Sequence, residues 1–393
     1  MSRLRFSASA MLLVLPLILP PLSFLATEAP AGDLYAEYLR FTPEKTFPTS
    51  LHSRRVGHST LYSKHLGGLE TLTNIPVEDL GCLECHHGSE MRADGSAIDP
   101  ASYEPSCADC HDSTQGNPGP VNDPDICLEC HRRQAGELAA QLPDVHRDAG
   151  FTCTSCHTKS EMHGDGNVYS SMLAPGARKV ACENCHLDAD NPAPKPSPVN
   201  PYHEIHAKRV DCSACHAQTM LVCSNCHVPG IGQPIGVHQG FKMLVQSTRD
   251  KEVHAAAYMS ITTDEDKTFY SILPRHTHSI VRNGVSSCKD CHFNEIVQQY
   301  LADGTITVLG NKDDRPVFAK GIIPIPENWK DALQFAFWKS DNGTWEFLKN
   351  EADQSRLIFA MPLSERQMQI LGHDYEKRSR RCRPRGKCNK RGK

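Results

Sequence analysis

Cysteine and histidine recur in one local pattern, which constrains the fold of this chain more than any other feature. Sixteen of the 18 cysteines form eight Cys-x-x-Cys pairs, and a histidine follows the second cysteine of every pair. Histidine makes up only 21 of the 393 residues, so its recurrence after all eight pairs is not a matter of chance. Numbered 1 to 8 along the chain, the motifs are Cys82-Cys85-His86, Cys107-Cys110-His111, Cys127-Cys130-His131, Cys153-Cys156-His157, Cys182-Cys185-His186, Cys212-Cys215-His216, Cys223-Cys226-His227 and Cys288-Cys291-His292.

This spacing is the signal for covalent attachment of haem c. Two thiols bond the two vinyl groups of one haem, and the histidine binds its iron. Zinc ribbons and disulfide-linked secreted proteins also use paired cysteines, but neither class needs a histidine directly after the second cysteine. The sequence therefore predicts eight covalently bound haems.

The spacing between motifs indicates how the haems are arranged. Between each motif histidine and the next motif lie 20, 15, 21, 24, 25, 6 and 60 residues, so there is no fixed repeat and a solenoid is excluded. A haem is large relative to a segment of this length, and glycine and proline together number 53, so we expect few long elements. The predicted fold is mainly α with extensive coil, an irregular multihaem fold with short helices and little sheet. The six-residue interval forces haems 6 and 7 to be neighbours, and the 60-residue interval is long enough for a separate lobe.

The second axial ligand of each iron decides between an electron carrier and an enzyme. Thirteen histidines lie outside the motifs, which is five more than eight haems need. With histidine in surplus, we treat Met91, Met162, Met172, Met220, Met243 and Met259 as packing residues, although methionine is an alternative ligand. His373 lies 80 residues beyond the last motif and is not expected to be a ligand. The candidates are His58, His65, His87, His146, His163, His203, His206, His238, His276 and His278.

Local position favours some of these candidates. His146 and His206 lie seven and six residues before motifs 4 and 6. His203 and His206 share one face if their segment is helical, and His276 and His278 share one face of an extended strand.

The N-terminus, residues 1–31, has the pattern of a signal peptide. Arg3 and Arg5 precede an apolar run from residue 11 to 25, and Ala29-Pro30-Ala31 fits a cleavage site. The alternative is a membrane-spanning helix, but three prolines interrupt the run and it is short for a span. We therefore expect an exported protein, in the periplasm or at the outer cell surface, with no membrane span in the mature chain.

The C-terminal part differs from the predicted octahaem domain, residues 32–300. Residues 301–372 contain neither cysteine nor histidine but all three tryptophans. We predict a helix over 327–338, and Ser364 with Gln367 predicts a capping box at the start of another. This haem-free region is interpreted as a packing unit that covers haem edges, the alternative being a docking surface for a redox partner.

The tail, residues 373–393, is basic. Ten lysines and arginines and no acid lie between 377 and 393, although the whole chain has a formal net charge of −4. Such a run is normally disordered, and an acidic partner is one possible ligand for it. Cys382 and Cys388 lie in the tail without a following histidine.

Residues 52–300 resemble the multihaem c-type cytochromes of anaerobic metal- and sulfur-respiring bacteria. The eight motifs, Cys85-His86-His87 and the stretch HEIHAKRVDCSACH at 203–216 carry the resemblance. In small multihaem cytochromes the second imidazole of an adjacent pair such as His86-His87 serves a different haem. The resemblance implies low-potential haems with two histidine ligands, and redox partners such as other cytochromes or a quinol-linked donor rather than nucleic acid.

The motif count also matches octahaem enzymes similar to hydroxylamine oxidoreductase, nitrite reductase and tetrathionate reductase, which keep one haem with an open or unusual ligand. Some of these enzymes have lysine in place of a motif histidine, and this sequence has no such motif. An open haem also arises where a distal histidine is lacking, so the enzyme remains the alternative to the carrier.

Overall fold

The computed structural model describes residues 42–57, 62–76, 79, 103–111, 121, 123–222, 225, 240–263, 265–341, 344–348 and 351–375. The residues from Pro43 onward cluster as one unit. Motifs 1 and 7, the candidates His58, His87 and His238, the predicted signal peptide and the part of the tail that holds Cys382 and Cys388 lie outside the described residues.

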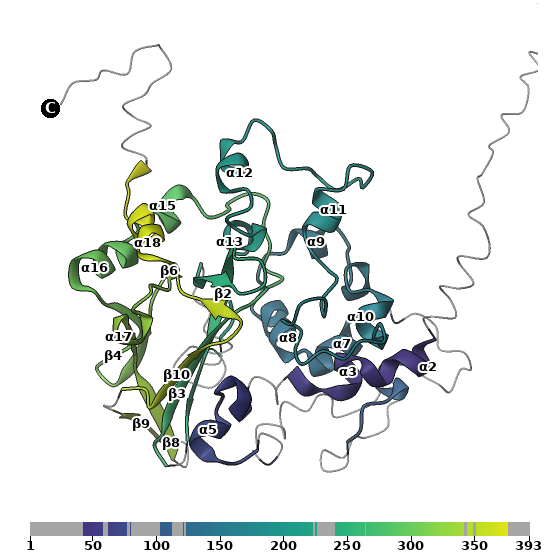
Figure 1. Ribbon diagram of the computed structural model, residues 1–393, viewed down its shortest axis with the longest axis horizontal. Coiled ribbons are helices and arrows are strands. Elements are labelled where there is room, and N and C mark those ends of the chain that lie inside the picture. The colour runs from purple at the N-terminus through teal and green to yellow at the C-terminus, as the bar shows by residue number, and fades with distance from the viewer. Residues whose placement is uncertain are drawn as a thin grey trace, which may run out of the picture. The chain divides into compact units, whose positions relative to one another are not determined.

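Short helices form the first half of the unit (Figure 1). Asp123, Asp144, Asn200 and Asp211 cap four of them by accepting a hydrogen bond from a backbone N–H of the first turn. The α-helices are α2 (Pro43–Thr46), α3 (Leu51–Arg54), α5 (Glu70–Thr73), α7 (Pro124–Cys130), α8 (Arg132–Ala139), α9 (Val145–Asp148), α10 (Lys159–His163), α11 (Glu183–His186), α12 (Pro201–His206) and α13 (Cys212–His216). The 3-10 helices are η1 (Phe47–Thr49), η2 (Lys64–Leu66), η5 (Cys107–Asp109) and η7 (Cys153–Ser155).

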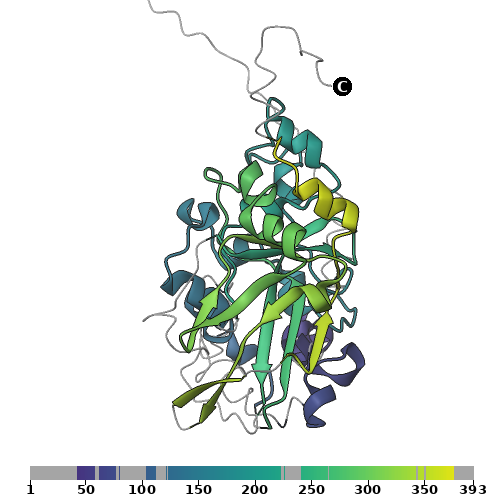
Figure 2. The ribbon, with the colours of Figure 1, turned by 90° about the vertical axis from the view of Figure 1, so that its left-hand side faces the viewer.

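Strands dominate the second half (Figure 2). They are β1 (Lys242–Ser247), β2 (Val253–Thr262), β3 (Thr268–Pro274), β4 (Ile306–Lys312), β5 (Arg315–Phe318), β6 (Ile322–Pro324), β7 (Leu333–Phe335), β8 (Phe337–Asp341), β9 (Thr344–Leu348), β10 (Gln354–Leu357) and β11 (Ala360–Met361). The helices among them are α15 (Cys288–Cys291), α16 (Glu295–Asp303), α17 (Trp329–Ala332) and α18 (Glu365–Leu371).

The largest sheet has six strands in the order β10-β3-β2-β1-β11, with β6 also paired to β1. β1, β2 and β3 pair antiparallel, with Leu244 opposite Ala255 and Tyr258 opposite Ile272. β6 pairs parallel to β1, and β10 parallel to β3, so strands from both sides of residue 300 share this sheet. Smaller sheets have the order β5-β4-β7 and β8-β9.

The prediction of a mainly helical fold with little sheet is wrong. The 60-residue interval between motifs 7 and 8 holds β1 to β3, and all the other described strands, β4 to β11, lie beyond α16. Every residue of β3 is buried, and so are six consecutive residues of β2. Such strands lack the alternation of apolar and polar residues that identifies a strand in a sequence, because they are covered on both faces.

The predicted helix over 327–338 is also wrong. Only Trp329–Ala332 is helical, and the chain then enters β7, which pairs parallel to β4. Leu333 and Phe335 are buried while Gln334 between them is exposed, which is the period of a strand rather than of a helix. The predicted capping box is confirmed, since Ser364 and Gln367 cap α18 reciprocally.

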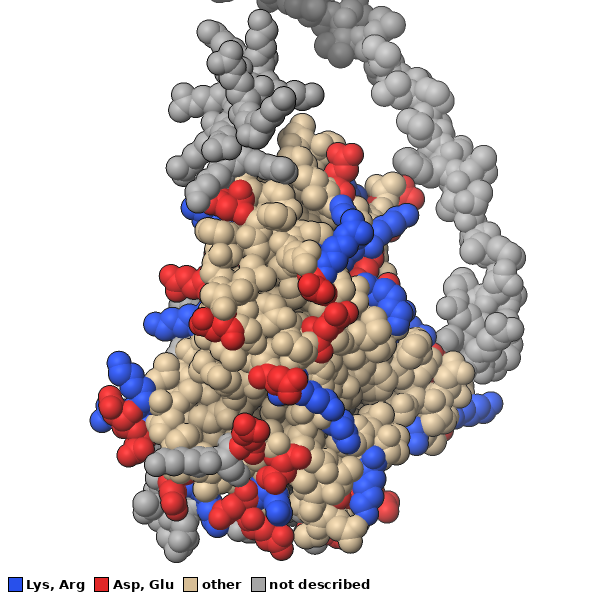
Figure 3. All heavy atoms as spheres, turned by 60° about the vertical axis from the view of Figure 1, so that its left-hand side comes forward, with Lys and Arg blue, Asp and Glu red and all other residues tan. Residues whose placement is uncertain are grey.

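One apolar core supports the sheets. Met243, Tyr258, Ile272, Ile323 and Trp329 belong to its largest cluster, and Tyr270 stacks on Phe335 with ring centres 4.1 Å apart. No helix among the described residues is both long and apolar enough to cross a membrane. On the face seen in Figure 3, the described acidic and basic side chains are interspersed rather than separated into patches of one sign.

Candidate functional site: paired histidines

All six described motifs adopt one helical turn. In motifs 2 to 5 and 8 the histidine N–H donates to the carbonyl oxygen of the first cysteine, at 2.6–3.0 Å. Motif 6 is the helix α13 itself. Because residues three apart share one helix face, the turn directs both cysteines of a motif to the same side.

The residues around the cysteines favour this turn. Ser106 with Asp109, Thr152 with Ser155 and Ser287 with Asp290 form capping boxes around motifs 2, 4 and 8. Asp211 caps α13 of motif 6 by accepting from the Ser213 N–H at 2.8 Å. The polar residues at these positions thus stabilise the local geometry of the motif.

Every described motif histidine faces a second histidine from outside the motifs. The ring centres of the six pairs lie 6.0–6.4 Å apart. The pairs are His111 with His163 at 6.0 Å, His131 with His52 at 6.1 Å, His157 with His278 at 6.4 Å, His186 with His146 at 6.1 Å, His216 with His203 at 6.3 Å and His292 with His206 at 6.4 Å.

This separation fits two axial ligands of one iron. An imidazole nitrogen lies about 2 Å from a bound metal ion and about 1 Å from its own ring centre, so two imidazoles on opposite sides of one ion have ring centres about 6 Å apart. A tetrahedral zinc site needs four ligands, but the described residues contain no group of three or more metal-ligating side chains. The first cysteine of each described motif is a free thiol, as attachment to a vinyl group requires. The residues therefore fit haem, whose macrocycle supplies the other four ligands.

Hydrogen bonds at Nδ1 orient several of these rings. The Nδ1 atoms of the motif histidines His186, His216 and His292 lie 2.6, 2.9 and 3.1 Å from backbone carbonyl oxygens. The facing residues His163 and His206 make the same contact at 3.0 Å, each to the carbonyl four residues earlier. A carbonyl only accepts, so Nδ1 carries the proton and Nε2 is left with the lone pair that binds a metal.

At other rings a carboxylate, rather than a backbone carbonyl, lies at Nδ1. Glu161 Oε2 lies 2.9 Å from His157 Nδ1, and the same side chain accepts from the Val180 N–H at 2.9 Å. Burial acts to raise the pKa of Glu161, but the hydrogen bonds from Val180 and His157 outweigh it and lower the pKa. Glu137, which is 1% exposed, lies 3.4 Å from His278 Nδ1 and accepts from Thr277 Oγ1 at 2.8 Å. Both rings of the pair His157 and His278 therefore have a glutamate side chain at Nδ1.

The thiols of successive motifs lie close enough to affect one another. Burial raises the pKa of Cys110 to about 11, with further contributions from Asp109 and from Cys130 of motif 3. Burial and then Cys153 of motif 4 raise the pKa of Cys127 to about 12. These contacts place motif 3 between motifs 2 and 4.

Thiols of the later motifs, as far as motif 8, also lie close to one another. Cys156 of motif 4 lies near Cys185 of motif 5, and Cys182 of motif 5 adjoins Cys212 of motif 6. Burial raises the pKa of Cys291 to about 12, and the nearby Cys215 of motif 6 contributes in the same direction. The described motifs therefore follow one another in space in the order 2, 3, 4, 5, 6, 8.

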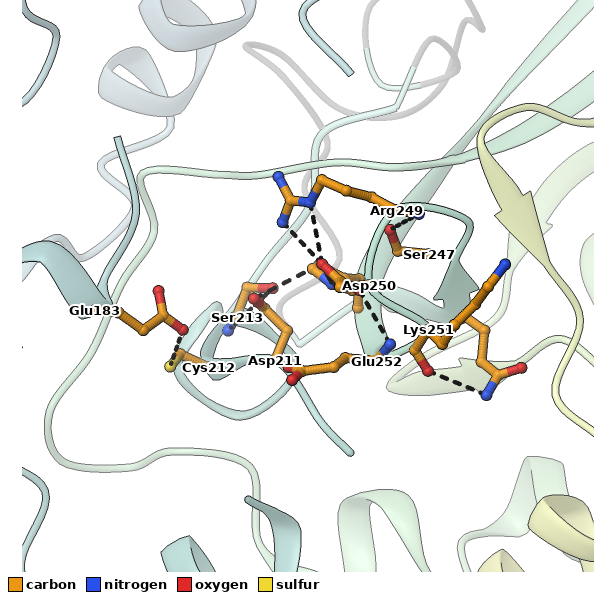
Figure 4. Close-up of polar contacts among 11 residues, drawn as sticks. Glu183, Asp211, Cys212, Ser213, Ser247, Arg249, Asp250, Lys251 and Glu252 are labelled. Atoms are coloured by element: carbon orange, nitrogen blue, oxygen red, sulfur yellow. Dashed lines mark hydrogen bonds and ion pairs between the residues drawn. The ribbon is translucent and has the colours of Figure 1, made fainter. Parts of the chain in front are cut away.

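Polar contacts connect motifs 5 and 6 to the sheet (Figure 4). The Cys212 thiol donates to Glu183 Oε1, with 3.7 Å between the sulfur and the oxygen. The carboxylate of Asp250 accepts from Arg249 and lies 2.9 Å from Nε2 of the buried His254. His254, on β2, also lies 3.6 Å from Asp211, which caps motif 6, so the start of β2 packs against that motif.

The candidate ligands from the sequence are placed as follows. Five of them, His146, His163, His203, His206 and His278, face motif histidines. His65 instead contacts Ser63 Oγ at 2.6 Å, and His276 faces the non-motif His254 with ring centres 6.3 Å apart. His58, His87 and His238 lie outside the described residues.

Sequence reasoning did not select His52, which faces His131 of motif 3. Its side chain is partly buried, and this burial lowers its pKa and favours the neutral ring that binds metals. Nothing in its local sequence distinguishes it from His58 or His65, because the motif it faces lies far away in the chain. Three of the six methionines, Met220, Met243 and Met259, are buried in apolar clusters and pack there.

Comparison with known families supports a multihaem c-type cytochrome. Residues 145–228 match the family described as cytochrome c3, and this segment contains motifs 4 to 7 together with His146, His163, His203 and His206. Members of such families hold haem c covalently, transfer electrons to and from redox partners and are typically exported. No curated protein and no solved structure matched the chain.

Proposed function

We propose that this chain is an exported octahaem c-type cytochrome that carries electrons through closely spaced haems, each with two histidine ligands. One observation carries the proposal: each of the six described motif histidines faces a second histidine at 6.0–6.4 Å between ring centres. Motifs 1 and 7 have the same sequence pattern, and the histidine surplus extends the same ligation to them.

The paired rings favour a carrier over an enzyme. Bound haem supplies one-electron chemistry at its iron. At the six described motifs, two histidines bound to one iron would leave no position at which nitrite, hydroxylamine or a sulfur oxyanion binds. These pairs would disfavour inner-sphere substrate chemistry at their haems, while an exposed haem edge would still permit electron exchange with a partner.

The hydrogen bonds at Nδ1 support low reduction potentials. A carboxylate or carbonyl that accepts from Nδ1–H makes the ring a stronger electron donor at Nε2. Stronger donation stabilises the ferric state relative to the ferrous state, which lowers the potential. Glu161 at His157 and Glu137 at His278 exert this effect on both ligands of haem 4.

The contacts between motifs support a path for electrons through the six described motifs. Thiols of neighbouring motifs adjoin in the order 2, 3, 4, 5, 6, 8, and haems attached to these cysteines would lie close to one another. His203 and His206 on α12 face motifs 6 and 8, so one short helix spans two successive sites. Redox partner proteins, such as other cytochromes or a quinol-linked donor, would exchange electrons at the ends of this path.

Two measurements on the exported protein test the proposal. Mass spectrometry is expected to give a mass eight haems above that of the polypeptide, and the colour should survive denaturation because thioether bonds do. Spectra of the oxidised protein are expected to show only low-spin haem. Extractable colour or bound zinc would refute haem attachment, and a high-spin signal together with turnover of a nitrogen or sulfur oxyanion would favour the octahaem enzyme.

A further inference from the structure

A lysine is buried in the sheet between motifs 6 and 8. Lys242, the first residue of β1, is 1% exposed. Its Nζ donates to the carbonyl oxygen of Ala217 at 2.6 Å and to Ser286 Oγ at 2.8 Å. Ala217 directly follows the motif 6 histidine, and Ser286 lies two residues before motif 8, so the ammonium group joins the two haem-binding segments.

The groups that act on this ammonium belong to both motifs. Burial lowers the pKa of Lys242, whereas Cys291, Cys215 and Asp290 act in the opposite direction. Cys215 is the second cysteine of motif 6 and Cys291 that of motif 8. Once both sulfurs are thioethers they carry no charge, so the ammonium would lie beside two haem edges.

The fold alone does not require a cation here. Residues around β1 are apolar, and Met243 and Leu244, which follow Lys242, are 0% and 4% exposed. Burial of an ammonium group is costly unless it is hydrogen-bonded, and an apolar side chain of similar volume is often as stable or more so at such a position.

We propose that Lys242 is a positioning residue that raises the reduction potentials of haems 6 and 8 by holding a buried positive charge beside both. This proposal rests on the function proposed above. It makes the two haems the preferred location of electrons at the motif 8 end of the path.

Electrostatics gives the direction of the shift in reduction potential and shows which haems it affects most. Reduction adds a negative charge at the iron, so a nearby cation favours the ferrous state. Solvent and salt screen a buried charge far less than an exposed one, so the effect of Lys242 exceeds that of a surface lysine at a similar distance. The effect is greatest at haems 6 and 8, because the thiols that act on the ammonium belong to these two motifs.

The test compares three variants of the mature holoprotein. Lys242→Gln removes the charge but keeps an N–H donor for Ala217 and Ser286, and Lys242→Arg keeps the charge. Lys289→Gln is the matched control, since Lys289 lies inside motif 8 but is exposed. Redox titration followed by paramagnetic NMR of haem methyl signals reports the potential of each haem, and contacts of these signals with the residue 242 side chain identify haems 6 and 8.

In Lys242→Gln we expect the potentials of haems 6 and 8 to fall while the others stay unchanged. A tenfold fall in the ratio of reduced to oxidised haem at fixed potential is a shift of about 59 mV for a one-electron couple. Lys242→Arg should retain the potentials, and Lys289→Gln should shift them much less. Unchanged potentials in Lys242→Gln, an equal shift of all haems, or equal shifts in the glutamine and arginine variants would overturn the role of the charge.

Failure of this inference differs from failure of the proposed function. If wild-type protein carries eight low-spin haems and the variants do not change their potentials, only the role of Lys242 is refuted. If wild-type protein carries no covalent haem, the proposed function is refuted and no titration is run. If Lys242→Gln fails to mature, Lys242→Arg provides the test. A shift of the potentials of haems 6 and 8 in this variant, which keeps the charge, would refute the electrostatic role. Unchanged potentials would support it.

Discussion

The motif-bearing half of the chain and the sheet differ in what holds them together. Among the described residues between 43 and 216, the buried hydrophobic side chains are Leu69, Leu142 and Ala214. The rest of the apolar core begins at Ala217, and large side chains such as Phe151 and Leu187 are exposed in the first half at 49% and 62%. The comparison fits the proposed function: covalent haem would replace a side-chain core in one region, while the other region is stabilised as an ordinary globular protein.

Production of the chain without haem attachment should show the largest effect. Fixing the backbone costs about 1–2 kcal/mol per residue, which three buried apolar side chains do not offset over the first half. We expect residues 123–216 to lose protection against hydrogen exchange while β2 and β3 keep theirs. Equal protection of both regions in the haem-free chain would contradict the comparison.

Truncation of the sheet core should affect stability without affecting the haems. Ile272 on β3 is fully buried, and Ile272→Ala should lower the free energy of unfolding of the sheet by about 2–5 kcal/mol. Ile370→Ala is the matched control, because this side chain is 39% exposed and should change stability far less. Denaturant unfolding followed by tryptophan fluorescence measures the change, and a shifted haem spectrum in the native Ile272→Ala protein would be the contrary result.

Removal of one facing histidine should change one haem only. We expect His146→Ala, His206→Ala and His52→Ala each to produce one high-spin haem and to leave the others low-spin, because each ring faces a single motif histidine. The same outcome is expected for His87→Ala, on the sequence alone. Electron paramagnetic resonance counts the high-spin signal.

His373→Ala is the control for these variants. The ring of His373 packs against Tyr375. None of the six described motif histidines faces it in the way that they face their paired histidines. It should leave every haem low-spin, and a high-spin signal in this variant would refute the assignment of facing rings as ligands.

Loss of a hydrogen bond to a ligand should have the smallest effect. Glu161→Gln replaces the carboxylate at His157 Nδ1 by a neutral amide, so the ring donates less to iron and the potential of haem 4 should rise. Glu129→Gln, within motif 3 and half-exposed, should leave the potentials unchanged. Redox titration of both variants measures the haem 4 potential. A fall of this potential in Glu161→Gln would contradict the role assigned to Glu161.

The sequence predicted local features of the site and missed long-range ones. The capping box of α18 is set by neighbours, and the placement of His203 and His206 on one helix follows from their spacing. The pairing of His52 with His131 depends on tertiary packing, which no local pattern reports. The position of His276 beside His254 likewise depends on the sheet, so adjacency to His278 did not decide its surroundings.

The sheet was missed for a related reason. The apolar content of 39% is low when averaged over the whole chain, and this average gave no sign of an extended side-chain core. The apolar residues are instead concentrated beyond Ala217, where β2 and β3 are buried along continuous stretches. An average over the chain conceals a core that occupies only one part of it.

The partner of His157 has a consequence for the order of synthesis. Chains emerge from the ribosome N-terminus first, so His52, His146, His203 and His206 are made before the motif histidines they face. His278, which faces His157 of motif 4, follows β3 by four residues and is made much later. In the proposed cytochrome, haem 4 would therefore lack its second histidine until β1 to β3 have been made, and completion of this ligand pair would require that the two halves of the chain have assembled.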